Sequence, residues 1–235
     1  MYELQSRVYV SRADAGGRMK FAGAVEIMQD CSQMWLESEP AFRQFLAERG
    51  LGMFLTSRQA DVVRLPRYGE PFTVRTSIYD ANAFFGYRNT VLYGGDGQPC
   101  VRSWCIGAFV SLQTGRLARL PAEQRARITI DPRVDMEYLD KKIPVPELPG
   151  RETDPIPVRR SDIDLNRHMN NARYVEAALE CLPEDFSIRR MRVEYKKPAR
   201  YGDRLHPLCI DTADGTHLVL LRDDAGSPYA VLEFS

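Results

Sequence analysis

The chain has 235 residues, and its 32 lysines and arginines balance 32 aspartates and glutamates, so the formal net charge is zero. This balance argues against a general nucleic-acid binder, which is usually strongly basic, and a hydrophobic content of 44% argues against a disordered chain. The longest wholly apolar run, residues 104–110, is far shorter than the roughly 20 residues of a membrane-spanning helix.

Residues 1–7 contain no apolar signal-peptide core, so we expect a cytoplasmic protein with no membrane partner. The cysteines are odd in number and form no CxxC pair. We therefore interpret them as reduced thiols in the core. They are Cys31, Cys100, Cys105, Cys181 and Cys209.

The first half begins with a helix. Apolar residues recur at helical spacing from Phe21 to Trp35 and cover so much of its surface that we expect it to be buried. Pro40 precedes a shorter amphipathic segment at 42–46. Four strands are then expected, at 60–65, 72–78, 85–93 and 101–112.

Residues 131–157 hold six of the fifteen prolines, so we expect an extended linker there. After it, a helix containing Tyr174 and Cys181 ends before Pro183. Strands are expected at 191–195, 204–210, 217–221 and 229–234. No helix separates consecutive strands, which favours antiparallel sheets over a parallel βαβ arrangement.

The two halves resemble each other. Residues 10–14 match 158–162 and, after a two-residue gap, 22–31 match 172–181 at an offset of 150; the motif RYGE at 67–70 returns as RYGD at 200–203. Matches in the same order indicate a duplicated domain. We expect an α+β protein divided into 1–130, a linker at 131–157, and 158–235, with each half a long buried helix wrapped by an antiparallel sheet.

The segment at 161–174 concentrates polar side chains just before the second helix. It places Asp164, Asn166 and His168 two residues apart, and His is the side chain whose pKa suits proton transfer near neutral pH. Asp and Asn also cap helices and form turns, which is the alternative interpretation. The corresponding loop of the first half, 15–20, looks two residues shorter and has no His, Asn or acid, which favours a catalytic role.

These residues also carry a family resemblance. The segment DLNRHMNN at 164–171 resembles the D-x-N-x-H-x-N-N motif of the acyl-acyl carrier protein thioesterases of plant plastids and bacteria. Trp104 followed by QTGRL at 113–117, and VEYKK at 193–197, are similar to two further motifs of that family. The resemblance covers nearly the whole chain in order.

The resemblance implies a tandem, or double, hot-dog fold that hydrolyses the thioester between a fatty acyl chain and acyl carrier protein. The sequence has no Gly-rich phosphate loop, HExxH motif or metal-ligand cluster, so we expect no cofactor or metal. The resemblance assigns the chemistry to Asp164, Asn166 and His168 and houses the acyl chain largely in the first hot-dog. In the plant enzymes the third motif continues into a Glu-Cys pair with catalytic roles, whereas here it continues KPA. The missing cysteine favours direct attack by water.

Our mechanistic hypothesis is that His168, held by Asp164, takes a proton from the attacking water. Asn166 and N–H groups at Asn170 and Asn171 would stabilise the oxyanion. Asp162 is a competing base, but its apparent repeat partner Asp14 favours a structural role. Glu194 is either a further acid or an ion-pair partner of the neighbouring lysines.

Four aromatic residues could line an acyl pocket, although such residues are more often plain core: Trp35, Phe84, Phe85 and Tyr87. Residues 186–204 carry a local net charge of +5 and could dock the acidic acyl carrier protein, or could form solvated strand edges. His206 and His217 are interpreted as structural.

Two other functions stay open. Hot-dog enoyl-thioester hydratases also place Asp and His before the buried helix, with one residue more between them, and a non-catalytic acyl-binding protein would use the polar loop only as a cap. The sequence also leaves open the acyl chain length, a carrier-protein or coenzyme A thioester, and a monomer or a homodimer.

Overall fold

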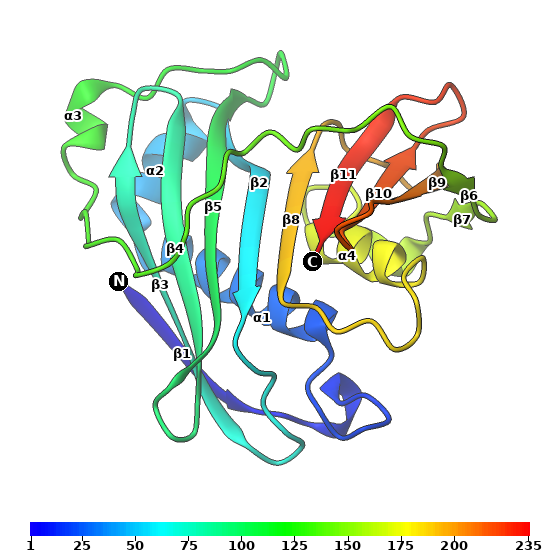
Figure 1. Ribbon diagram of the computed structural model, residues 1–235. Coiled ribbons are helices and arrows are strands. Elements are labelled where there is room, and N and C mark those ends of the chain that lie inside the picture. The colour runs from blue at the N-terminus through cyan, green and yellow to red at the C-terminus, as the bar shows by residue number, and fades with distance from the viewer. The chain divides into compact units, whose positions relative to one another are not determined.

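The computed structural model describes all 235 residues and divides into two compact units (Figure 1). Unit 1 comprises residues 1–56 and 60–138, and unit 2 comprises 57–59 and 139–235. The main boundary therefore falls inside the proline-rich segment 131–157. None of the helices combines the length and the apolar character that a membrane span requires.

Unit 1 is a sheet with the strand order β1-β3-β4-β5-β2 and one long helix. Its strands are β1 (Tyr2–Arg7), β2 (Leu51–Val62), β3 (Pro71–Ala81), β4 (Phe85–Gly94) and β5 (Pro99–Ser111), and its helices are α1 (Phe21–Glu37), α2 (Pro40–Glu48) and the short α3 (Ala122–Arg125). The sequence missed β1 and the first nine residues of β2. In β1 side chains alternate between half-buried and exposed, so it carries little apolar signal.

Helix α1 is buried along most of its length, as predicted. It buries a broad apolar surface, from Phe21 through Ala24, Val25, Ile27, Met28 and Cys31 to Trp35. This surface packs on β1, β3 and β4 (Figure 1). Side chains alternate along a strand, so only every second residue of β4 faces the helix. Arg88 and Thr90 do, whereas Phe85 and Tyr87 face the other side.

Unit 2 has the same plan with a shorter helix. Its strands are β8 (Arg190–Tyr195), β9 (Arg204–Asp211), β10 (His217–Arg222) and β11 (Pro228–Phe234), with the two-residue strands β6 (Arg151–Glu152) and β7 (Ile156–Pro157) paired to β9. The order is β8-β11-β10-β9-β6, and neighbouring strands are antiparallel, as expected. Helix α4 (Asn171–Leu179) packs on β10 and β11.

The duplication is visible in backbone hydrogen bonds. The N–H of Val8 donates to Glu70 O at 3.0 Å, and the N–H of Val158 donates to Asp203 O at 2.9 Å. Likewise, the N–H of Met19 donates to Pro66 O and that of Met169 to Ala199 O. In each case the donor in unit 2 is 150 residues after the donor in unit 1. Both units therefore build the start of the helix with the same hydrogen bonds.

The expected two-residue gap between the repeats is wrong. The N–H of Lys20 donates to Arg12 O at 2.7 Å, and the N–H of Asn170 donates to Asp162 O at 2.8 Å. The offset of 150 therefore runs unbroken through the loop, and the two loops are equally long. Asp162 corresponds to Arg12, and the true counterpart of Asp14 is Asp164.

Arg192 of β8 holds the linker against unit 2. Its guanidinium donates to the carbonyl oxygens of Asp140 and Lys142 and pairs with Glu233 at 2.8 Å. The side chain is only 11% exposed, so these groups have little water to replace a lost partner.

We expect Arg192→Met to destabilise the protein by about 3 kcal/mol, because it leaves the Glu233 carboxylate and two carbonyl oxygens without their partner. For a chain of this size that corresponds to a fall of about 6–12 °C in the thermal unfolding midpoint. Arg200→Met, on an exposed side chain, is the control and should change little. Equal midpoints for the two variants would contradict the role of Arg192.

Candidate functional site

The candidate site is built on a tight loop between an extended segment and α4. Ile163 and Met169 form an antiparallel bridge. Within it, the N–H of Asp164 donates to His168 O and the N–H of Arg167 donates to Asp164 O, both at 3.0 Å. The loop is therefore closed by its own backbone and sets His168 at its end.

The Asp164 carboxylate shapes this loop. Its Oδ1 accepts a hydrogen bond of 2.8 Å from the N–H of Asn166, as aspartates do in turns. In unit 1, Asp14 Oδ1 accepts from the N–H of Arg18, also at 2.8 Å. Both aspartates therefore hold their loops, but through different donors, because Arg18 corresponds to His168 and not to Asn166. The structure records no hydrogen bond between the Asp164 carboxylate and the His168 ring.

Arg167 adopts a strained backbone conformation. It is the one non-glycine residue with a positive φ, at 60°, and its counterpart Gly17 has a φ of 71°. A left-handed conformation costs a residue with a Cβ roughly 1–2 kcal/mol. Such strain is often found at functional sites.

His168 differs from the two other histidines. Its ring is half-buried and makes no recorded hydrogen bond, so both ring nitrogens are available. By contrast, His206 Nε2 lies 2.7 Å from Asp224 Oδ1, and His217 Nδ1 pairs with Asp211. The structural interpretation of His206 and His217 agrees with these pairs.

The start of α4 lies directly after His168. Asn170 is the N-cap of α4. Its Oδ1 accepts a hydrogen bond of 2.9 Å from the N–H of Ala172, and its own N–H donates to Asp162 O. Asn171 is the first helical residue, and its N–H has no recorded acceptor, as is usual there. Of the two expected backbone donors, Asn171 is therefore the available one. The side chain of Asn166 is exposed.

The two competing acids are both engaged elsewhere. Asp162 Oδ2 accepts from the N–H of Arg159 at 2.7 Å, which stabilises the short 3-10 helix Arg160–Asp162 that ends at this residue. Glu194 pairs with Lys196, and it also accepts from the N–H of Ile143 at 3.3 Å. Its neighbour Tyr195 faces α4, donating to Asn171 O, so Glu194 lies on the opposite face of the strand.

Two of the five free cysteines contact each other, which the sequence did not indicate. A hydrogen bond from Cys209 lowers the pKa of the Cys181 thiol to about 7, whereas burial raises that of Cys31, its repeat counterpart, to about 11. Cys181 follows the C-terminal end of α4, about 15 Å along the helix axis from Asn171. This distance keeps the thiol away from His168.

The four aromatic candidates do not form one pocket. Trp35 lies on α1 and packs with Phe42 and Phe109 on the face of the sheet that α1 covers. The Arg88 guanidinium is 4.3 Å from its ring centroid. Phe85 and Tyr87 lie on the other face of the sheet, and Phe84 is 41% exposed in the hairpin between β3 and β4.

Phe85 and Tyr87 belong to an apolar cluster that contacts the first part of the linker. They pack there with Tyr79, Trp104 and Tyr138. Asn89, opposite Trp104 in the sheet, accepts a hydrogen bond of 2.9 Å from the Tyr138 hydroxyl. Trp104, a residue of the family motif, is therefore a core residue that anchors the linker to unit 1.

The basic stretch 186–204 is less positive than its count of side chains suggests. Arg192 pairs with Glu233, Lys196 with Glu194 and Lys197 with Asp223. The partners of Arg192 and Lys197 come from later strands and turns, so local counting could not find them.

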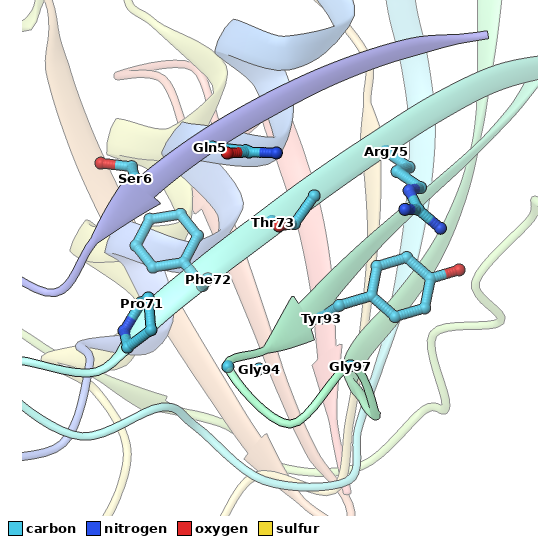
Figure 2. A pocket seen from close by; sticks show the side chains of 10 residues that line it. Gln5, Ser6, Pro71, Phe72, Thr73, Arg75, Tyr93, Gly94 and Gly97 are labelled. Carbon is cyan, nitrogen blue, oxygen red and sulfur yellow. The ribbon is translucent and has the colours of Figure 1, made fainter.

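A shallow hollow of about 290 Å³ lies on unit 1, at the edge formed by β1, β3 and β4 (Figure 2). Arg75 and Tyr93 line it, with the guanidinium 5.2 Å from the ring centroid and paired with Glu3. None of the candidate catalytic residues lines this hollow. The structure contains no group of three or more His, Cys, Asp or Glu side chains placed to hold a metal ion.

Comparison with known families decides what kind of protein carries this site. The acyl-ACP thioesterase N-terminal domain matches residues 1–128, and the acyl-ACP thioesterase C-terminal domain matches residues 149–226. The chain belongs to the acyl-ACP thioesterase family. These matches confirm the sequence resemblance, and the solved structures described below confirm the expected fold class.

Curated relatives of this family are distant and longer. The chain is 24% identical over 165 residues to acyl-[acyl-carrier-protein] hydrolase FATB3 of Cuphea viscosissima, which covers 66% of the chain and 40% of the relative. It is 25% identical over 195 residues to the palmitoyl-acyl carrier protein thioesterase of Cuphea hookeriana, which covers 75% and 46%. The chain thus matches less than half the length of these chloroplast proteins.

Solved structures in the acyl-ACP thioesterase family share the fold over the whole chain. An acyl-ACP thioesterase from Bacteroides thetaiotaomicron matches with a TM-score of 0.88 at 20% identity, covering 99% of this chain and 96% of that one. The 12:0-ACP thioesterase from Umbellularia californica matches with a TM-score of 0.86 at 17% identity, covering 100% and 96%.

We expect Arg167→Gly to leave the protein at least as stable, with a gain of up to about 1 kcal/mol, since glycine removes the left-handed strain but adds chain entropy. The matched variant Gly17→Ala introduces that strain in unit 1 and should lower stability by about 1 kcal/mol. Thermal unfolding midpoints measure both. A clear loss in Arg167→Gly would mean that the arginine side chain, rather than the backbone, holds the loop.

Proposed function

We propose that this protein hydrolyses the thioester of acyl-acyl carrier protein and releases a free fatty acid. The observation that carries the proposal is the half-buried His168 ring, with both nitrogens available, directly before the unpartnered N–H at the start of α4. Family membership supplies the substrate class, because the relatives are named as hydrolases of acyl carrier protein esters. Five free cysteines favour a reducing compartment, and we propose the cytoplasm.

The proposed reaction needs one base and one oxyanion site. His168 takes a proton from water, whose oxygen attacks the thioester carbonyl carbon. The N–H of Asn171 and the side chain of Asn166 donate to the oxyanion, and the helix N-terminus adds positive potential. When the tetrahedral intermediate collapses, the C–S bond breaks and the imidazolium returns its proton to the leaving thiolate.

Asp164 has two proposed tasks in this scheme. Its Oδ1 holds the loop through Asn166, and its negative charge favours the imidazolium that forms during attack. For the acyl chain, we propose the exposed Phe84 as a contact, and we assign Trp35 to the core around Phe42 and Phe109. Phe85 and Tyr87 are assigned to the packing around Trp104.

We expect His168→Ala to lower kcat for acyl-acyl carrier protein by at least about a hundredfold while the thermal unfolding midpoint stays close to that of the wild type, because general-base catalysis is worth 10²–10⁴-fold. His206→Ala and His217→Ala are the controls and should keep normal turnover. Release of free thiol is the readout. Near-normal turnover in His168→Ala would remove this residue from the mechanism.

We expect Asp164→Asn to reduce kcat at least about tenfold without a loss of stability. Asparagine can still accept the Asn166 hydrogen bond, so the variant removes the charge and keeps the turn. Asp14→Asn makes the same change in unit 1 and should leave kcat unchanged. Full activity of Asp164→Asn would restrict Asp164 to shaping the loop.

A further inference from the structure

Five exposed arginines gather at the end of unit 2 that carries the candidate loop. They are Arg159, Arg160, Arg167, Arg200 and Arg204. Backbone contacts bring their three segments together: Val158 donates to Asp203 O, Met169 donates to Ala199 O, and Pro157 pairs with Arg204 across β7 and β9. We call these five residues the arginine patch.

The arginine patch has no acidic partners within the protein. None of its five guanidinium groups makes an ion pair, and Arg160 lies over the exposed ring of Tyr201, at 5.3 Å. The acids in the same segments are turned to the backbone: Asp162 accepts from Arg159 N, Asp164 from Asn166 N, and Asp203 from Arg200 N. The positive charge thus points outward, whereas the negative charge is held within the loops.

The repeat shows that the fold does not need these arginines. The same positions in unit 1 are occupied by Tyr9, Val10, Gly17, Arg67 and Pro71. Only one of the five is basic, although the backbone hydrogen bonds are the same in both units. Unit 1 carries basic residues at other positions of the same segment, Arg12, Arg18 and Lys20, so the positions of the arginine patch, rather than its charge alone, are particular to unit 2.

We infer that the arginine patch is the surface on which the acidic acyl carrier protein docks. This inference rests on the proposed function. A carrier must bring its thioester to His168, and Arg167 is the residue before it in the chain. Leu165, fully exposed at the tip of the same loop, adds an apolar contact among the charges. Of the stretch 186–204, the arginine patch keeps Arg200 and Arg204. Three other basic residues of that stretch, Arg192, Lys196 and Lys197, are paired internally and are left out of the proposed docking region.

The test compares two substrates with the same acyl chain. One is acyl-acyl carrier protein and the other is the acyl thioester of pantetheine, which carries no charge. The triple variant R159E/R200E/R204E should lower kcat/KM for the carrier substrate at least about thirtyfold and change it less than about twofold for the pantetheine ester. Raising the salt concentration should reduce kcat/KM of the wild type for the carrier substrate only.

Two control proteins sharpen the comparison. Arg67→Glu reverses the charge of the residue that corresponds to Arg200 in unit 1, where Glu70 accepts from Arg67 N as Asp203 does from Arg200 N. This variant should behave as the wild type. R159K/R200K/R204K keeps the charge and should retain most of the activity on the carrier substrate.

An equal loss on both substrates, or none on the carrier substrate, would overturn the docking assignment. If the wild type hydrolyses neither ester, the proposed function fails, and docking is then tested by titration with acyl carrier protein that bears its phosphopantetheine arm. Weaker binding to the triple variant than to the wild type and Arg67→Glu supports the arginine patch. Equal binding to all three rejects it.

Discussion

Two backbone hydrogen bonds hold the candidate loop in place at the start of α4. Met169 donates to Ala199 O and Asn170 donates to Asp162 O, so one bond ties the loop to the segment after β8 and the other ties it to the chain before it. Between these bonds the chain reverses direction within the five residues from Asp164 to His168. The position of the His168 ring, the cap on α4 and the free N–H of Asn171 all depend on this reversal.

The sequence predicted the elements that have a strong apolar signal. Helix α1 was found within a few residues of its ends because its buried residues recur at helical spacing. Strands β3, β4 and β5 were found because they are largely apolar runs bounded by turn residues, and β4 and β5 are buried over most of their length. Strand β1 was missed because it lies at the edge of the sheet and buries no residue fully. The alternation within β4 could place Phe85 and Tyr87 on a common face, but only the pairing with β5 shows which face that is.

The sequence could not predict the alignment of the two loops, or which of the basic residues are paired, because both depend on contacts that the residue types do not show. Arg12 and Asp162 are equivalent because each offers a backbone carbonyl oxygen to the same donor, and any residue can supply that atom. The matching letters Asp14 and Asp162 therefore suggested the wrong alignment. The partners of Arg192 and Lys197 are 41 and 26 residues further along the chain, so a local count of charges overstated the positive surface.

The two loops have equal lengths, so unit 1 offers a backbone segment equivalent to the one that carries the candidate residues in unit 2. Residues 14–20 and 164–170 start and end on the same hydrogen bonds, and both contain a left-handed residue at the same step. The backbone of the segment is therefore equivalent in the two units, and the two loops differ in their side chains. The backbone of residues 14–20 could therefore carry the same polar side chains as residues 164–170 without a change in loop length.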